Sequence, residues 1–131
     1  MKILQPGGWP RPSGYANGIS TSGRLIFTAG IIGCNETGNV PSRHFEDQFG
    51  LALRNILAII AEDGAGPEHI VRLTIYVTDK VQYIARRDDI TPIWKSIMGA
   101  HYPAIALVEV KGLVNSAALV EIEATAVVPE E

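Results

Sequence analysis

The chain has 131 residues, of which 47% are hydrophobic and 19% are charged, and its formal net charge is −3. This length suffices for one domain with a hydrophobic core and is too short for two ordinary domains. The composition argues against disorder, and without a basic footprint we expect no nucleic-acid partner.

The first segment, residues 1–13, is rich in proline and glycine and is predicted to form an extended arm. It lacks the apolar core of a signal peptide, and no apolar run approaches the roughly 20 residues of a membrane span. Cys34 is the only cysteine, which excludes an internal disulfide and favours a reducing compartment. We therefore expect a cytoplasmic protein that has no contact with a membrane.

Two short strands follow the arm, at residues 15–20 and 24–30, and the turn at Ser22 and Gly23 predicts that they pair as a hairpin. A long helix is predicted from Phe45 to Glu62, with Ser42 as its N-cap. Its apolar residues recur at steps of three and four: Phe45, Phe49, Leu53, Ile56, Leu57 and Ile60.

A third strand is predicted from about His69 to Val77, with an apolar face made of Val71, Leu73, Ile75 and Val77. A short turn near residues 80–84 should then lead into a second helix that ends before Gly99. Because proline is tolerated in the first turn of a helix, we expect Pro92 to lie there. Two further strands, residues 104–110 and 118–128, are expected to pair with each other.

The last strand alternates apolar and polar residues in a way that separates its two faces. One face carries the apolar set Val120, Ile122, Ala124, Ala126 and Val128. The other face carries Glu121 and Glu123, roughly 7 Å apart at the rise of a strand. Because like charges disfavour joint ionisation, at least one carboxylate should reach water, a donor or a ligand. A solvated sheet face explains the pair as readily as a binding site does.

This order of elements predicts an α+β two-layer sandwich, a mixed sheet with two helices on one face. Nothing in the chain is left to cover the other face, so we expect self-association through it. No spacing of Cys and His residues suggests a metal site. Cys34 has no neighbour in sequence that would activate it, which favours a structural thiol over a nucleophile.

Several stretches resemble the Rid (reactive intermediate deaminase, YjgF-type) family. Residues 14–18 and 25–30 resemble its N-terminal hairpin, residues 45–62 its long helix, and residues 70–79 its central strand. Tyr102-Pro103-Ala104 and residues 120–124 resemble its C-terminal signature. The resemblance implies one chorismate-mutase-like domain over residues 1–131 and a homotrimer whose sheets form a central barrel. It also implies hydrolysis of small enamines or imines to ketones and ammonia, without a cofactor.

The same resemblance implies roles for single residues. Glu121 matches the glutamate that positions water, Tyr15 matches an aromatic residue of the cleft, and backbone groups near Gly30 and Ala106 should bind the substrate. Ile105 stands where the family has an arginine that clamps the substrate carboxylate. Because isoleucine cannot donate hydrogen bonds, we expect a substrate other than 2-aminoacrylate.

Other side chains leave two interpretations open. His101 could bind substrate at the cleft mouth or be a loop histidine with a local hydrogen bond. Arg86 and Arg87 could anchor a carboxylate across an interface or form a solvated helix face. The protein itself could be a deaminase or a non-catalytic trimer that binds a small ligand or a protein.

Overall fold

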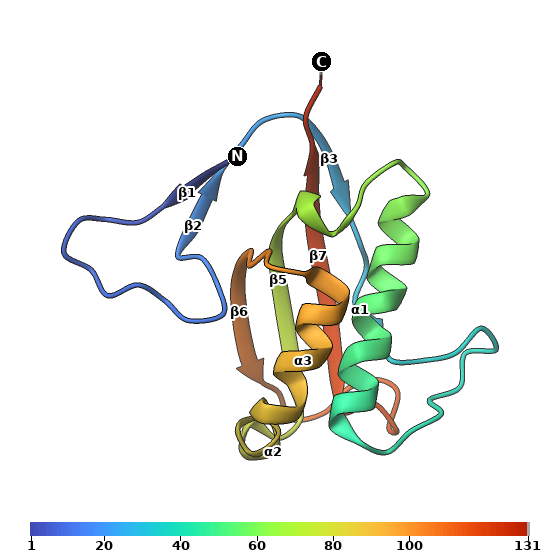
Figure 1. Ribbon diagram of the computed structural model, residues 1–131. Helices are drawn as coiled ribbons and strands as arrows, with labels where there is room; N and C mark the ends of the chain where they lie inside the picture. The colour runs from blue at the N-terminus through green and yellow to red at the C-terminus, as the bar shows by residue number, and fades with distance from the viewer. Residues whose placement is uncertain (131) are drawn as a thin grey trace.

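The computed structural model describes residues 1–130 and shows a five-stranded mixed sheet with helices on one face (Figure 1). Helices α1 (Phe45–Ala61) and α3 (Arg87–Met98) cover that face, which we call the helix-covered face. No described helix or strand covers the other face, which we call the open face. The predicted α+β two-layer sandwich is therefore confirmed. No described helix is long and apolar enough to cross a membrane.

Strand β7 (Val120–Val128) is the centre of the sheet and runs antiparallel to β3 (Arg24–Phe27), β4 (Ile31–Ile32) and β5 (Ile70–Val77). Strand β6 (Ala104–Glu109) lies beyond β5 and runs parallel to it. The predicted pairing of the last two strands is wrong, because β5 lies between them. The helices between β5 and β6 return the chain to the same sheet in a parallel direction.

The core lies between α1, α3 and the inward side chains of β5 and β7. The predicted alternation in β7 is observed, since Val120, Ile122, Ala124 and Ala126 are all buried. In β5 the prediction fails at Val71, which is only half-buried, because an irregularity between Ile70 and Arg72 shifts the register. Because of this shift the side chain of Ile70 points into the core, where it has no exposed surface.

Helix α1 begins where its apolar periodicity begins, at Phe45, but its cap differs from the prediction. His44 occupies the N-cap position and makes no capping hydrogen bond. Ser42 instead accepts a hydrogen bond from the His44 amide and donates one to Asp47. The buried Gln48 donates to the carbonyl of Ala117 and accepts from the amide of Leu119, which fixes the chain just before β7.

Helix α2 (Lys80–Ala85) is capped by Asp79, whose carboxylate accepts from the amides of Val81 and Gln82. Helix α3 then begins at Arg87, a full turn earlier than predicted, so Pro92 lies inside the helix. Thr91 donates to the Arg87 carbonyl, and Asp88 and Asp89 lie in the first turn, where acidic residues stabilise a helix. These contacts explain why the helix extends N-terminal to its proline.

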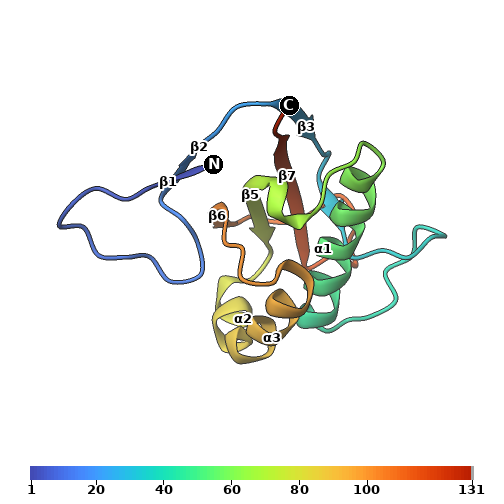
Figure 2. The same ribbon diagram turned by 45° about the horizontal axis from the view of Figure 1, so that its top comes forward.

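The N-terminal segment forms a small sheet of its own, in which β1 (Lys2–Leu4) pairs antiparallel with β2 (Gly18–Ser20). In both views the loop between them extends away from the helices (Figures 1 and 2). The predicted hairpin of β2 with β3 is wrong, because β3 pairs with β7 instead. The loop reaches the main sheet at Ala16, whose amide donates to the Pro103 carbonyl at 2.9 Å. This contact brings Tyr15 to the edge of β6.

Candidate functional site

The predicted site residues lie on opposite faces of the sheet. Glu121 is opposite Tyr76 and Ile32 in the register of β7, and it alternates with the buried Ile122, so its side chain is on the open face. Ile105 is opposite the buried Leu73, so its side chain is on the helix-covered face. One chain therefore does not bring Glu121 and Ile105 together.

A bulge between β3 and β4 places Gly30 beside Glu121. Four residue steps from Phe27 to Ile31 are opposite three steps of β7, so one extra residue must be accommodated. Thr28 anchors the bulge by accepting a hydrogen bond from the Ala124 amide at 2.9 Å. A Cβ atom at position 30 would overlap the carboxylate of Glu121, so a larger residue here would require the Glu121 side chain to move. The structure therefore brings together Glu121 and Gly30, which the resemblance assigned to one site.

The second carboxylate of β7 has a different environment. The Tyr76 hydroxyl donates to Oε1 of Glu123 at 2.8 Å. This hydrogen bond, together with partial desolvation and the charges of Glu123 and Glu121, raises the pKa of Tyr76 above its usual value. Within residues 1–130 no side chain or amide donates a hydrogen bond to the carboxylate of Glu121. Glu121 is therefore the carboxylate that remains available for a water molecule or a ligand.

The helix-covered face contains a cleft of about 960 Å³ at the edge of β6, which we call the aromatic cleft. Its floor is apolar, its walls are aromatic, and charged side chains line its rim. The lining residues are Ser13, Gly14, Tyr15, Phe49, Ile75, Lys80, Tyr83, Ile84, Arg87, Ile90, Thr91, Trp94, Lys95, Tyr102, Ile105, Leu107 and Glu109. Tyr15 and Ile105, both predicted site residues, thus share one cleft.

The aromatic walls are held by packing and hydrogen bonds. Tyr102 stacks on Trp94 with ring centroids 5.9 Å apart and planes inclined by 10°. Trp94 donates from Nε1 to the His101 carbonyl at 3.2 Å, and Tyr83 packs edge-on against Phe45. Trp94 was not predicted as a site residue, because its helical spacing is that of an ordinary core residue. Only the fold shows that its ring borders a cleft.

The two neighbouring arginines that the sequence left undecided have different surroundings. Arg86 lies 3.9 Å from Glu46 and 3.7 Å from Asp89, so acidic side chains on both α1 and α3 are near its guanidinium. Arg87 lines the aromatic cleft, and its guanidinium carbon lies 5.9 Å from the centre of the Tyr83 ring. The two residues therefore cannot be treated as one solvated helix face.

His101 and Ala106 lie near the cleft but outside its lining. Nε2 of His101 is 2.6 Å from the Ile70 carbonyl, a contact that ties the loop before β6 to the start of β5. This geometry favours the interpretation as a loop histidine. Ala106 is opposite Thr74 in the parallel pair, so its side chain is on the open face, next to the strand position of Ile105.

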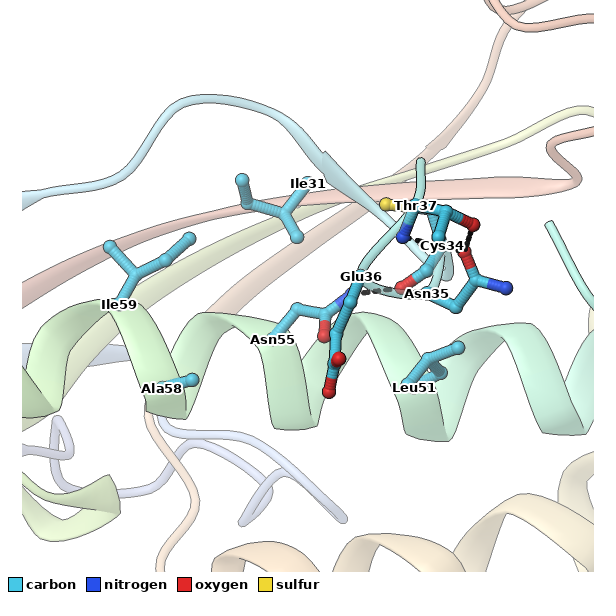
Figure 3. Close-up of a pocket in the computed structure, with 9 residues that line it drawn as sticks. All are labelled: Ile31, Cys34, Asn35, Glu36, Thr37, Leu51, Asn55, Ala58 and Ile59. Carbon is cyan, nitrogen blue, oxygen red and sulfur yellow. Dashed lines mark hydrogen bonds between the residues drawn. The ribbon is translucent and has the colours of Figure 1, made fainter. Parts of the chain in front are cut away.

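A second hollow of about 640 Å³ lies between α1 and the loop that follows β4, and we call it the Cys34 groove (Figure 3). Asn55 spans it by donating to the carbonyls of Ile32 and Cys34, and Asn35 accepts from Thr37 and Asn39 within the loop. These polar groups thus hold the loop in place, and no lysine or arginine lines the groove.

Within residues 1–130 no group of three or more His, Cys, Asp or Glu side chains could hold a metal ion.

Comparisons with known proteins identify a family and several relatives of the chain. A family model described as endoribonuclease L-PSP matches residues 10–128. TdcF of Escherichia coli, named as a reactive intermediate deaminase, is 32% identical over 117 residues, which are 86% of this chain and 85% of TdcF. A RutC family protein of Synechocystis is 32% identical over 136 residues and 98% of each chain.

Solved structures of similar proteins extend the comparison to the fold. YyfB of Yersinia pestis, a Rid family protein of unknown function, superposes with a TM-score of 0.84 at 28% identity, covering 97% of this chain and 98% of YyfB. E. coli TdcF with bound serine superposes with a TM-score of 0.70 at 30% identity, covering 98% of this chain and 99% of TdcF.

Proposed function

The chain belongs to the Rid (YjgF-type) reactive intermediate deaminase family, and from this premise we propose that it hydrolyses a small enamine or imine to the ketone and ammonia. The observation that carries the proposal is the carboxylate of Glu121 lying against Gly30, next to the open face and without a donor in residues 1–130. A carboxylate in that position is suited to hold and activate a water molecule. We propose a cytoplasmic location, which the single cysteine favours.

The proposed site needs more than one chain. Glu121 with Gly30 and the aromatic cleft with Ile105 occupy opposite faces of one sheet, so a substrate that contacts both must lie between copies. We propose a homotrimer in which the open faces form a central barrel. Leu25 and Phe27 support it, because these apolar residues of β3 are 59% and 68% exposed on the open face.

The proposed chemistry is addition of water followed by loss of ammonia. Protonation of an enamine on carbon gives the iminium ion, and a neutral imine reaches the same ion by protonation on nitrogen. Glu121 then removes a proton from water as the water oxygen attacks the iminium carbon, and the electrons of the carbon–nitrogen double bond move to nitrogen, which gives a neutral carbinolamine. The proton held by Glu121 passes to the amine, the carbon–nitrogen bond breaks as ammonia leaves, and the hydroxyl returns its proton to the Glu121 carboxylate as the carbonyl forms. Positioning of water and substrate supplies much of the rate.

The other predicted residues would bind rather than react. We propose that the Tyr15 ring contacts the ligand and that backbone groups near Gly30 and Ala106 bind its polar atoms. His101 would hold the loop before β6 through its contact with the Ile70 carbonyl, and we propose no contact between its ring and the ligand. Ile105 contributes no charge, so we propose a substrate other than 2-aminoacrylate.

The experiment is an ammonia-release assay on the purified protein. An L-amino acid oxidase generates imines in situ from a panel of amino acids, and ammonia and ketone formation are compared with the buffer rate. We expect acceleration with at least one imine. A protein of the proposed trimer mass that accelerates none of them contradicts the deaminase proposal.

An alternative function is a non-catalytic trimer that binds a small ligand or a protein. Ile105 favours it, because isoleucine at the position of the family's arginine leaves the cleft without that anchor for a substrate carboxylate. Ligand binding without turnover in the same assay would support this alternative. Although the family model is described as an endoribonuclease, we propose no RNA substrate, since the net charge of −3 offers phosphates no attraction.

A further inference from the structure

We propose that Arg87 is the carboxylate anchor of the aromatic cleft and that this cleft takes acids with a planar apolar body, such as 2-imino acids with an aromatic side chain. The claim that such an acid is turned over rests on the proposed function. The claim that Arg87 binds its carboxylate does not.

The first argument is the position of Arg87. It opens α3, immediately after the end of α2, and lines the same cleft as Ile105. Its guanidinium lies near the Tyr83 ring, and Tyr83 is itself held edge-on by the buried Phe45. An arginine placed against an aromatic ring is pre-organised, so less side-chain entropy is lost when it binds a carboxylate.

The second argument is charge. Within residues 1–130 Arg87 has no carboxylate within 4.0 Å, whereas Arg86 has Glu46 and Asp89. Lys80 and Lys95 also line the cleft, against Glu109 as its single acidic residue. Glu109 accepts a hydrogen bond from the Lys80 amide. The cleft is thus lined by three cationic side chains and one acidic side chain, although the whole chain has a net charge of −3. This local excess of positive charge attracts an anion to the cleft.

The third argument is the shape and polarity of the space below the cations. Ile75, Ile105 and Leu107 form an apolar floor, and Trp94 and Tyr102 form a stacked wall. The volume of about 960 Å³ is that of a cleft for a ligand much larger than a three-carbon acid. Ile105 then becomes the surface on which the apolar body rests, and the charge that position 105 lacks is supplied by α3.

The experiment measures binding directly, by calorimetry on the purified full chain. Phenylpyruvate and pyruvate serve as stable 2-oxo acid probes that need no turnover. We expect phenylpyruvate to bind more tightly than pyruvate. Arg87→Gln should weaken phenylpyruvate about ten- to hundredfold, the effect of losing a charged hydrogen-bond partner. Arg86→Gln is the matched control, with the same charge change one residue away, and should change binding less than about twofold.

The outcomes separate this inference from the proposed function. Unchanged phenylpyruvate binding by Arg87→Gln overturns the anchor, and so does a loss found only in Lys95→Gln. Equal affinity for the two probes overturns the preference for an apolar body. Binding that depends on Arg87, with no ammonia release from any imine, supports the anchor and contradicts the deaminase. Circular dichroism of each variant shows that the fold is retained, and Arg87→Lys should recover part of the affinity.

Discussion

The two faces of the sheet hold different halves of the site that we propose. The helix-covered face has a closed core and, at its edge, an aromatic cleft with three cations. The open face has the Glu121 carboxylate beside Gly30 and large apolar side chains exposed to solvent. In the proposed function one half would hold an acid and the other would activate water. Because a single chain keeps the two halves apart, the proposed catalysis requires the proposed assembly.

The largest expected effect comes from disturbing the open face itself. Phe27→Glu places a charge on the exposed face of β3, where burial between subunits would leave it without a partner. We expect the wild type to scatter light as three times the 14.1 kDa chain mass and the variant to be a monomer without turnover. Val114→Glu makes the same change at a fully exposed loop residue and should remain a trimer. A wild-type monomer would contradict the assembled site.

The next-largest effect concerns the part of the proposed site that lies on the open face. Glu121→Gln should keep the fold, because no group in residues 1–130 donates a hydrogen bond to the Glu121 carboxylate. The change should remove the base that activates water. We expect kcat/KM for the best imine to fall by about 10²–10⁴. Glu123→Gln is the internal control on the same strand face and should cost less. Equal rates for Glu121→Gln and wild type would return Glu121 to the interpretation as a solvated strand residue.

A smaller effect is expected in the aromatic cleft, at Ile105. Placing an arginine in the half-buried position 105 supplies a bidentate donor to a small carboxylate. We expect Ile105→Arg to raise turnover of 2-aminoacrylate about a hundredfold over a weak wild-type rate. A dehydratase can generate this enamine in situ in a coupled assay. Fast turnover by the wild type would mean that a cation such as Arg87 already serves small acids, and Ile105 would not be the specificity switch.

The sequence predicted the parts of the fold that carry long periodic patterns. The helix from Phe45 and the alternation of β7 were found because each repeats over many residues. The hairpin of β2 with β3 was wrong because strands of three and four residues carry almost no pairing information. The start of α3 was missed because Pro92 dominates local propensity, whereas the acidic first turn and the Thr91 hydrogen bond decide it.

The residues proposed for the site were named by the family resemblance rather than by pattern alone. Glu121 and Gly30 were assigned together by resemblance, and the structure places them in contact. The aromatic cleft was not predicted, because Tyr83, Trp94 and Tyr102 are separated in sequence and resemble core residues one by one. The distinction between Arg86 and Arg87 also needed the fold, since their different neighbours belong to other elements.

The smallest expected effect concerns the difference between Glu121 and Glu123 on the open face, and it is measured through Tyr76. Because the hydrogen bond to Glu123 raises the pKa of Tyr76 above the usual 10.0, the folded state holds this proton more tightly than the unfolded state. The resulting stabilisation is fully present below pH 10 and is lost as the pH rises through the folded-state pKa.

We therefore expect the wild type to lose stability in alkaline solution more steeply than Tyr76→Phe, which has no hydroxyl to ionise. Urea unfolding below and above pH 10 measures the difference, and tyrosinate absorbance reports the ionisation itself. Glu123→Gln keeps an acceptor but removes the charge, so it should bring the Tyr76 titration back toward its usual range. Glu121→Gln should move that titration less, because Glu121 acts on Tyr76 only through space and is the last of the causes of its shift. A larger shift from Glu121→Gln than from Glu123→Gln would mean that the two carboxylates have exchanged the roles assigned to them here.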